Sequence, residues 1–172
     1  PYVQNPTTSS IVVAWEDFET TAPKVVYGVQ SLAEGSAPCS CAGIHCHCTL
    51  TGLLPATAYS YQVFDGEVPV SDAYAFRTKP QFIEPFTFAV CGDNRSDNSA
   101  HTLVIEAMSG KYSFVINTGD MVSDGENESH WDDYLEIEQP LQGHVTVFPS
   151  VGNHEVDDEK ADAYYRIFHT PA

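Results

Sequence analysis

The fold of the second half of the chain is decided by residues 86–120, FTFAVCGDNRSDNSAHTLVIEAMSGKYSFVINTGD. This stretch opens and closes with apolar runs rich in β-branched and aromatic residues, and the segment between them has the apolar spacing of an amphipathic helix. The sequence therefore predicts strands over 86–93 and 112–120 and a helix over 99–110. Strands that alternate with helices pair in parallel, through right-handed crossovers.

The same alternation continues toward the end of the chain. SHWDDYLEIEQPL, residues 129–141, predicts a second helix, and VTVFPSVGNHE, residues 145–155, predicts a third strand. We expect Asn98 or Ser99 to cap the first helix, since both residue types accept hydrogen bonds from the free N–H groups of a first turn. In such sheets ligands bind outside the carboxyl ends of the strands, so the residues that follow the three strands are candidates for a site.

A polar cluster that begins with glycine follows each of the three strands. Glycine allows a sharp turn that exposes the residues behind it. The clusters are GDNR at 92–95, GDMVSDG at 119–125 and GNHE at 152–155. Because the strand ends would lie side by side, we expect one crevice to contain Asp93, Asp120, Asn153 and His154.

The residue types at these strand ends suit a metal-dependent reaction. Carboxylates, an amide oxygen and an imidazole bind metals of intermediate hardness such as Mn, Fe or Zn. Two such ions about 3.5 to 4 Å apart clamp a phosphate and lower the pKa of a bound water, which then attacks phosphorus in line. Each cluster alone is typical of a turn, but three in order, each directly after an apolar run, favour a metal-phosphate site.

The first half of the chain has the pattern of an all-β domain. Runs rich in Val, Tyr, Phe and Thr alternate with turn signals at the spacing of a β-sandwich. Trp15 stands where a sandwich core needs a large side chain, and Tyr59, Tyr61 and Val63 alternate onto one face. The expected strands are SIVVAWED (10–17), PKVVYGV (23–29), HCTLTGL (47–53), AYSYQVFDG (58–66) and DAYAFRT (72–78).

Both halves resemble one enzyme family. PYVQNPTTSSIVVAWED and CTLTGLLPATAYSYQV, at 1–17 and 48–63, resemble the fibronectin type III-like N-terminal domain of purple acid phosphatase-like enzymes. The three strand-end clusters resemble the first three sequence blocks of calcineurin-like metallophosphoesterases, the superfamily of those enzymes. The resemblance implies a fibronectin type III-like sandwich over 1–80 and part of an αββα sandwich over 86–172. Between them, RTKPQFIEPF at 77–86 carries two prolines and predicts a linker over 81–85.

The resemblance also assigns roles to the strand-end residues. It makes Asp93 a ligand of the first metal and Asp120 the carboxylate that bridges two metal ions. Asn153 becomes a ligand of the second metal, and His154 stabilises the attacked phosphate or protonates the leaving oxygen. Arg95 could hold a phosphate oxygen as a fork donor, or it could be a plain surface charge.

This sequence departs from the family in several places. Arg95 stands where many members have the His of an Asp-x-His block, and Ser123 stands where purple acid phosphatases have a tyrosine ligand. A purple Fe(III)-tyrosinate centre is therefore not expected, and the first metal has fewer local ligands than usual. The further histidine blocks of the family would lie beyond Ala172, so we expect these residues to hold the first half of a dinuclear site and to be inactive alone.

Four cysteines crowd into CSCAGIHCHC, residues 39–48. A hairpin that turns through 42–45 puts all four sulfurs on one face and pairs Cys41 with Cys46 and Cys39 with Cys48. The four could form two disulfides or hold a tetrahedral Zn or Fe, and their Cys-x4-Cys-His spacing also fits a rare haem attachment. Cys91 stands apart and is expected to be a buried strand thiol.

The charge of the chain limits its partners. The 24 Asp and Glu against 7 Lys and Arg give a net charge of −17, which repels nucleic acid and anionic membranes. No apolar run approaches the roughly 20 residues of a membrane span. The chain begins at Pro1 and has clustered cysteines, so we expect a signal removed upstream and a secreted, periplasmic or extracellular protein.

Two functions remain open on the sequence. The first is hydrolysis of phosphate monoesters or diesters by a metal-activated water. The second is a structural or adhesive module, in which an uncovered sheet face assembles with copies of itself or with a partner. In an intact enzyme, the C-terminal half of the catalytic domain would cover that face.

Overall fold

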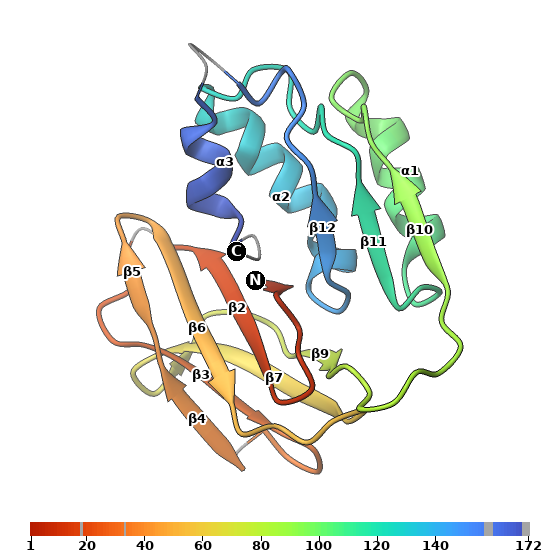
Figure 1. The fold of residues 1–172 in the computed structure, drawn as a ribbon. Coiled ribbons are helices and arrows are strands. Elements are labelled where there is room, and N and C mark those ends of the chain that lie inside the picture. Colours follow the sequence, from red (N-terminus) through yellow and green to blue (C-terminus); the bar gives the residue numbers. More distant parts are fainter. Residues whose placement is uncertain (18, 33, 157–159, 170–172) are drawn as a thin grey trace. The chain divides into compact units, whose positions relative to one another are not determined.

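The computed structural model describes residues 1–17, 19–32, 34–156 and 160–169. The chain divides into two compact units, Pro1–Pro85 and Phe86–Ala172 (Figure 1). The expected linker over 81–85 forms the end of the first unit. Within the expected domain over 86–172, residues 157–159 and 170–172 lie outside the described part of the chain.

Two antiparallel sheets form the first unit. One sheet has the order β1-β2-β6-β5, and the other has the order β4-β3-β7-β8, with β9 also paired to β7. The five expected strands are present, and β5 is the first arm of the predicted cysteine hairpin. The sequence pattern missed β1, β4 and β8, which have two to four residues each. The strands are β1 Tyr2–Gln4, β2 Ser10–Glu16, β3 Pro23–Gly28, β4 Gly35–Pro38, β5 Ser40–Ala42, β6 His45–Thr51, β7 Ala58–Asp65, β8 Val68–Pro69 and β9 Tyr74–Arg77.

One apolar core lies between these two sheets. Trp15 of β2 is 5% exposed, and Tyr59, Tyr61 and Val63 of β7 are buried on the same face of their strand, which confirms both predictions. Residues of β2 and β6 pack in one cluster with residues of β3, β7 and β9. The two sheets therefore face each other across a shared core.

The four clustered cysteines form two disulfides at one end of this core. Strands β5 and β6 make the hairpin, with Cys41 opposite Cys46, and the disulfides are Cys39–Cys48 and Cys41–Cys46. Cys46 and Cys48 lie on the buried face of β6. A sulfur bonded in a disulfide is not a thiolate, so the alternatives of a structural Zn or Fe, or of a haem, do not describe this hairpin.

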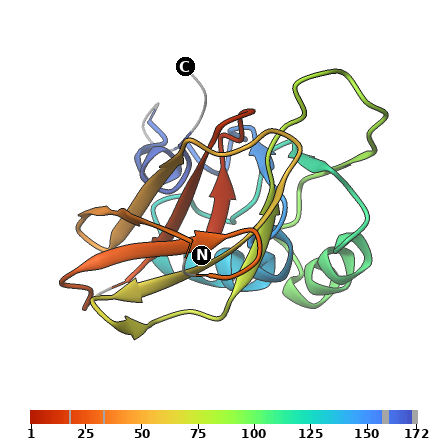
Figure 2. The same cartoon turned by 90° about the horizontal axis from the view of Figure 1, so that it is seen from below.

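A parallel sheet with helices forms the second unit. The sheet has the order β10-β11-β12, and both strand pairs are parallel, as predicted. Helices α1 and α2 lie on the same face of the sheet (Figure 2), where their apolar side chains pack on Val115 and Val147. The elements are β10 Phe88–Cys91, α1 Asn98–Met108, β11 Phe114–Asn117, α2 Glu128–Gln142, β12 Val147–Pro149 and α3 Asp162–Ile167.

The cap of α1 differs from the prediction. The N-cap is Asp97, and its carboxylate accepts hydrogen bonds from the backbone N–H groups of Ser99 and Ala100. The expected caps, Asn98 and Ser99, both lie inside the first turn. A carboxylate is a stronger acceptor than an amide or a hydroxyl and is also favoured by the helix dipole, so Asp97 takes the position.

The second face of this sheet is aromatic. Phe86, Phe88 and Phe114 contact one another, and Phe114 also meets the ring of Phe148. Phe88 is 46% exposed and Val90 is 58% exposed, although both belong to a strand. An apolar surface of this kind is typical of an interaction face. In the described part of the chain, no helix is long and apolar enough to cross a membrane.

Candidate metal-phosphate site

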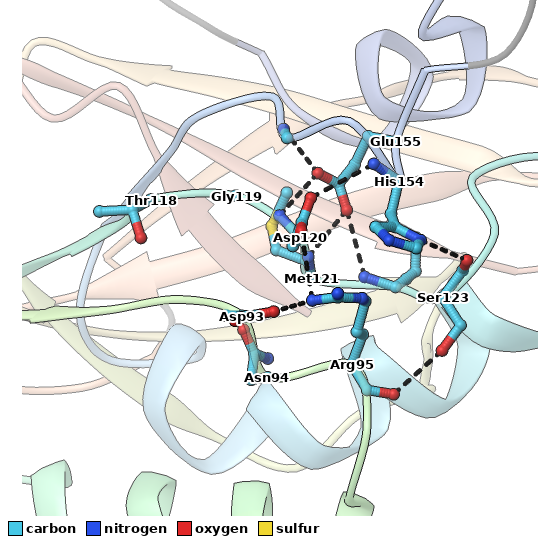
Figure 3. A network of polar contacts seen from close by, with 12 residues as sticks. Asp93, Asn94, Arg95, Thr118, Gly119, Asp120, Met121, Ser123, His154 and Glu155 are labelled. Atoms are coloured by element: carbon cyan, nitrogen blue, oxygen red, sulfur yellow. Dashed lines mark hydrogen bonds and ion pairs between the residues drawn. The ribbon is translucent and has the colours of Figure 1, made fainter.

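The three strand ends of the second unit come together (Figure 3). The backbone N–H of Asp93, after β10, donates to the carbonyl oxygen of Gly119, after β11, over 2.9 Å. The backbone N–H of His154, after β12, donates to Asp120 Oδ1 over 3.2 Å. The clusters that the sequence singled out are therefore neighbours in space.

Two glycines allow this close approach. Gly119 has φ +99°, and a Cβ at this position would lie 2.7 Å from the backbone nitrogen of Gly152. A Cβ at Gly152 would lie 2.2 Å from Asp120 Oδ1. Any larger residue at either position would push the second and third strand ends apart.

The two aspartates share an uncommon backbone conformation. Asp93 has φ 57° and Asp120 has φ 56°, both in the left-handed region that residues other than glycine rarely adopt. Asp tolerates this region better than most residues because its short polar side chain can bond locally. Two successive strands thus end in the same turn, and both carboxylates point toward Arg95.

Arg95 lies between the two carboxylates. Its Nη1 pairs with Asp93 Oδ1 and is 3.2 Å from Asp120 Oδ2. The side chain of Arg95 is 23% exposed, against 19% for Asp120 and 74% for Asp93. The pair with Asp120 is thus the better shielded of the two, and Arg95 belongs to the site.

The orientation of His154 follows from one hydrogen bond. Its Nδ1 is 2.8 Å from the carbonyl oxygen of Ser123. A carbonyl oxygen only accepts, so Nδ1 carries a proton and donates it. The other ring nitrogen, Nε2, is then the one that can exchange a proton with a ligand. Asn153 is exposed and lies between Gly152 and His154 on the same loop.

Glu155 is a site residue to which the sequence assigned no role. It is 2% exposed, and its Oε2 accepts from the backbone N–H groups of Gly152 (2.7 Å) and Asp120 (2.9 Å). Its Oε1 accepts from Met121 (2.7 Å) and Val122 (3.2 Å). This one carboxylate therefore holds the second and third strand ends together. No local pattern in the sequence distinguishes it from the other acids of residues 155–162.

A buried polar network supports the first two strand ends from below. Asn117 accepts from the backbone N–H of Gly119 (3.0 Å), and its side-chain nitrogen is 3.4 Å from Asn94 Oδ1. His101 of α1 contacts both neighbours through Nε2. This nitrogen is 2.9 Å from Nδ2 of the Asn94 side chain and 2.9 Å from Oε1 of Glu138 in α2. The two helices thus help to fix the loop that holds Asp93 and Arg95.

The two sides of Asp120 differ in whether they could bind a metal ion. Among residues 1–17, 19–32, 34–156 and 160–169, no three His, Cys, Asp or Glu side chains are grouped as a metal site. Between Asp93 and Asp120 the guanidinium of Arg95 already supplies a positive charge. On its other side Asp120 turns Oδ1 toward the loop of Asn153 and His154. Carboxylate and amide oxygens, the donor types of Asp120 and Asn153, are ligands of hard or intermediate cations.

Comparison with known proteins assigns a family to each unit. Residues 2–78 match the family model of the purple acid phosphatase N-terminal domain, and residues 86–171 match that of the calcineurin-like phosphoesterases. No match was found among the curated proteins.

Two solved structures share the fold. The purple acid phosphatase PPD1 from yellow lupin (Lupinus luteus) seeds is 20% identical, with a TM-score of 0.83 over 100% of this chain and 40% of its own. PhoD is 14% identical, with a TM-score of 0.71 over 99% of this chain and 45% of its own. The chain thus spans less than half the length of either protein. From its two domain matches, the chain belongs to the calcineurin-like phosphoesterases and carries the N-terminal domain of the purple acid phosphatases.

Proposed function

We propose that this chain supplies the first part of a metal-dependent site that hydrolyses phosphate monoesters or diesters. The observation that carries the proposal is the meeting of Asp93, Asp120 and His154 at the carboxyl edge of the parallel sheet. This edge is where open α/β sheets bind their ligands. The family match over 86–171 supports the same reaction class.

Each residue then has a chemical task. A bound metal would act as a Lewis acid and lower the pKa of a water for in-line attack. Asp120 and Asn153 would hold that metal, and the assignment of Asp93 to a first metal rests on the family resemblance. His154, anchored through Nδ1, presents Nε2 to a phosphate oxygen or to the leaving oxygen. Arg95 offers its remaining N–H groups to a phosphate oxygen.

The first unit and the aromatic sheet face have supporting roles in this proposal. The first unit is a fibronectin type III-like sandwich, which two antiparallel sheets around one core favour. The C-terminal half of the catalytic domain that the family resemblance implies would cover Phe86, Phe88 and Val90, because exposed apolar side chains favour burial. Two disulfides favour an oxidising compartment outside the cytosol, and the net charge of −17 disfavours nucleic acid as a partner.

Hydrolysis of p-nitrophenyl phosphate by the intact protein tests the reaction class. We expect turnover with Mn²⁺ or Zn²⁺, loss of turnover in EDTA and loss in Asp120→Asn. Asp132→Asn is the matched control, since Asp132 is an exposed carboxylate on α2 to which the proposed site assigns no role. If Asp120→Asn keeps the turnover of Asp132→Asn, then Asp120 does not hold a catalytic metal.

A second function, a non-catalytic assembly module, is favoured by the exposed aromatic face alone. In that case copies of the chain would pack through Phe88 and Val90, which are 46% and 58% exposed on β10. Sedimentation velocity of the intact protein and of Val90→Lys distinguishes the two functions. An assembly that Val90→Lys dissolves, in a protein without phosphatase turnover, supports the module; a monomer that hydrolyses the ester excludes it.

A further inference from the structure

We propose that Arg95 is a built-in cation that takes the place of one of the two metal ions, so that this site accepts at most one divalent ion. The inference rests on the proposed function and changes the number of metal ions that the site takes. It also identifies which side of Asp120 remains available to a metal.

The guanidinium of Arg95 lies between the two carboxylates of the site. Arg95 Nη1 pairs with Asp93 Oδ1 and stands 3.2 Å from Asp120 Oδ2 (Figure 3). These are the two carboxylates that a first metal would need. A metal ion that binds both carboxylate oxygens would have to lie between them. Arg95 Nη1 already fills that position, because it contacts both oxygens.

The guanidinium of Arg95 carries a positive charge but cannot coordinate a metal ion. A guanidinium stays protonated in proteins and has no lone pair to offer, so Arg95 cannot act as a metal ligand in the place of a histidine. Its positive charge also repels a divalent ion at short range, and the repulsion is screened weakly because the side chain is only 23% exposed. Arg95 therefore supplies charge without supplying coordination.

Ser123 stands at the position where purple acid phosphatases have a tyrosine ligand, and it contacts Arg95. Ser123 Oγ donates to the backbone carbonyl of Arg95 over 3.1 Å, and the Ser123 carbonyl accepts from His154 Nδ1. The two positions at which this chain lacks a usual ligand of the first metal are thus in direct contact. Both replacements remove donors from the same metal position, and neither affects Asn153.

The opposite side of Asp120 keeps its donors. Asp120 Oδ1 faces the third strand end, where it accepts from the backbone N–H of His154 over 3.2 Å. Asn153 is exposed on that loop, so its amide oxygen can join Asp120 in holding one ion. The single metal of the site would then lie on the Asn153 side and the arginine on the Asp93 side.

Metal titration of the intact protein tests this count. With MnCl₂ or ZnCl₂ in isothermal titration calorimetry, we expect at most one equivalent for the wild type and one more for Arg95→His, which restores a metal-binding side chain. Arg77→His, an exposed substitution of the same kind in the first unit, should match the wild type. Two equivalents in the wild type, or no gain in Arg95→His, would overturn the proposal.

A metal-free measurement separates this inference from the proposed function. In EDTA, Asp120→Asn should lower the unfolding midpoint of the second unit in the wild type, because Arg95 loses a paired charge. When Arg95→Gln is already present, Asp120→Asn should instead raise the unfolding midpoint, because it relieves the repulsion between Asp120 and Asp93. The same direction of shift in both backgrounds would contradict the role of Arg95. Absence of metal binding in every variant would instead contradict the proposed function. The opposite shifts of the unfolding midpoint in the two backgrounds would still be expected, because they do not depend on a metal.

Discussion

At the scale of single residues, the position of a side chain was easier to predict from the sequence than its partners. Asp93, Asp120 and His154 meet as expected because each follows an apolar strand, and parallel strands end at one edge of a sheet. Arg95 and Glu155 each also contact Asp120, which lies about 25 positions from the first and 35 from the second. No local spacing encodes such contacts.

Glu155 should be more important for folding than its neighbours in the acidic stretch. Glu155→Gln replaces one acceptor oxygen by an NH₂ group that faces backbone donors, so the four hydrogen bonds of Glu155 cannot all form. We expect a loss of about 2 to 3 kcal/mol in the unfolding free energy of the second unit. Urea unfolding followed by Trp131 fluorescence measures it. Glu106→Gln, on the exposed face of α1, is the control and should change little.

Cys91 makes the stability of the second unit depend on pH. Burial, together with the charge of Glu138, raises the pKa of its thiol to about 11, from 9.0. Below pH 9 both the folded and the unfolded thiol are protonated, so stability is full. Between pH 9 and 11 the unfolded thiol loses its proton first, so stability should fall. Urea midpoints at pH 8 and pH 10.5 measure the fall, which should be smaller in Cys91→Ala.

At the scale of elements, the segments that belong to the alternation of strands and helices were predictable, and isolated short segments were not. The alternation of strands and helices correctly predicted β10, α1, β11, α2 and β12. The missed strands β1, β4 and β8 are too short to show a period of two, and no neighbouring helix marks them as part of an alternating pattern. They form because a longer neighbouring strand offers free backbone groups. Helix α3, with six residues, is likewise too short for a clear apolar period.

The contact between the ends of β11 and β12 should tolerate no added side chain. Gly152→Ala would place its Cβ 2.2 Å from Asp120 Oδ1 and 2.3 Å from the Asp120 nitrogen. We expect a loss of about 1 to 3 kcal/mol in the second unit, through forced separation of the two strand ends. Gly66→Ala, which has φ +57° and open space around it, should cost about 1 kcal/mol from backbone strain alone. Equal losses would argue against a steric contact at Gly152.

At the scale of the whole molecule, each unit carries one tryptophan in its own core. Trp15 lies in the core of the first unit, and Trp131 is buried in the second. The two-unit division could be anticipated because the rhythm of the sequence changes near the two prolines of RTKPQFIEPF. Trp15→Phe and Trp131→Phe each leave one reporter, so the stability of each unit can be followed separately.

Reduction of the disulfides should therefore destabilise the first unit only. The bridges close loops with sequence separations of 9 and 5, and both lie in the first unit. Loops of this length contribute about 2 to 4 kcal/mol through the entropy of the unfolded chain. Urea unfolding with and without a phosphine reductant should shift the transition of Trp15 and leave that of Trp131 unchanged. A shift in the Trp131 transition would show that the bridges also stabilise the second unit.

The central claim is that the three strand ends of the second unit form a metal-phosphate site around Asp120. The most direct test is Mn²⁺ binding to the intact protein, measured by electron paramagnetic resonance, before and after Asp120→Asn. Loss of a carboxylate ligand should weaken binding by at least about tenfold, or 1.4 kcal/mol, while Asp132→Asn should leave the affinity unchanged. The same Mn²⁺ affinity in all three proteins would contradict a metal site at these strand ends.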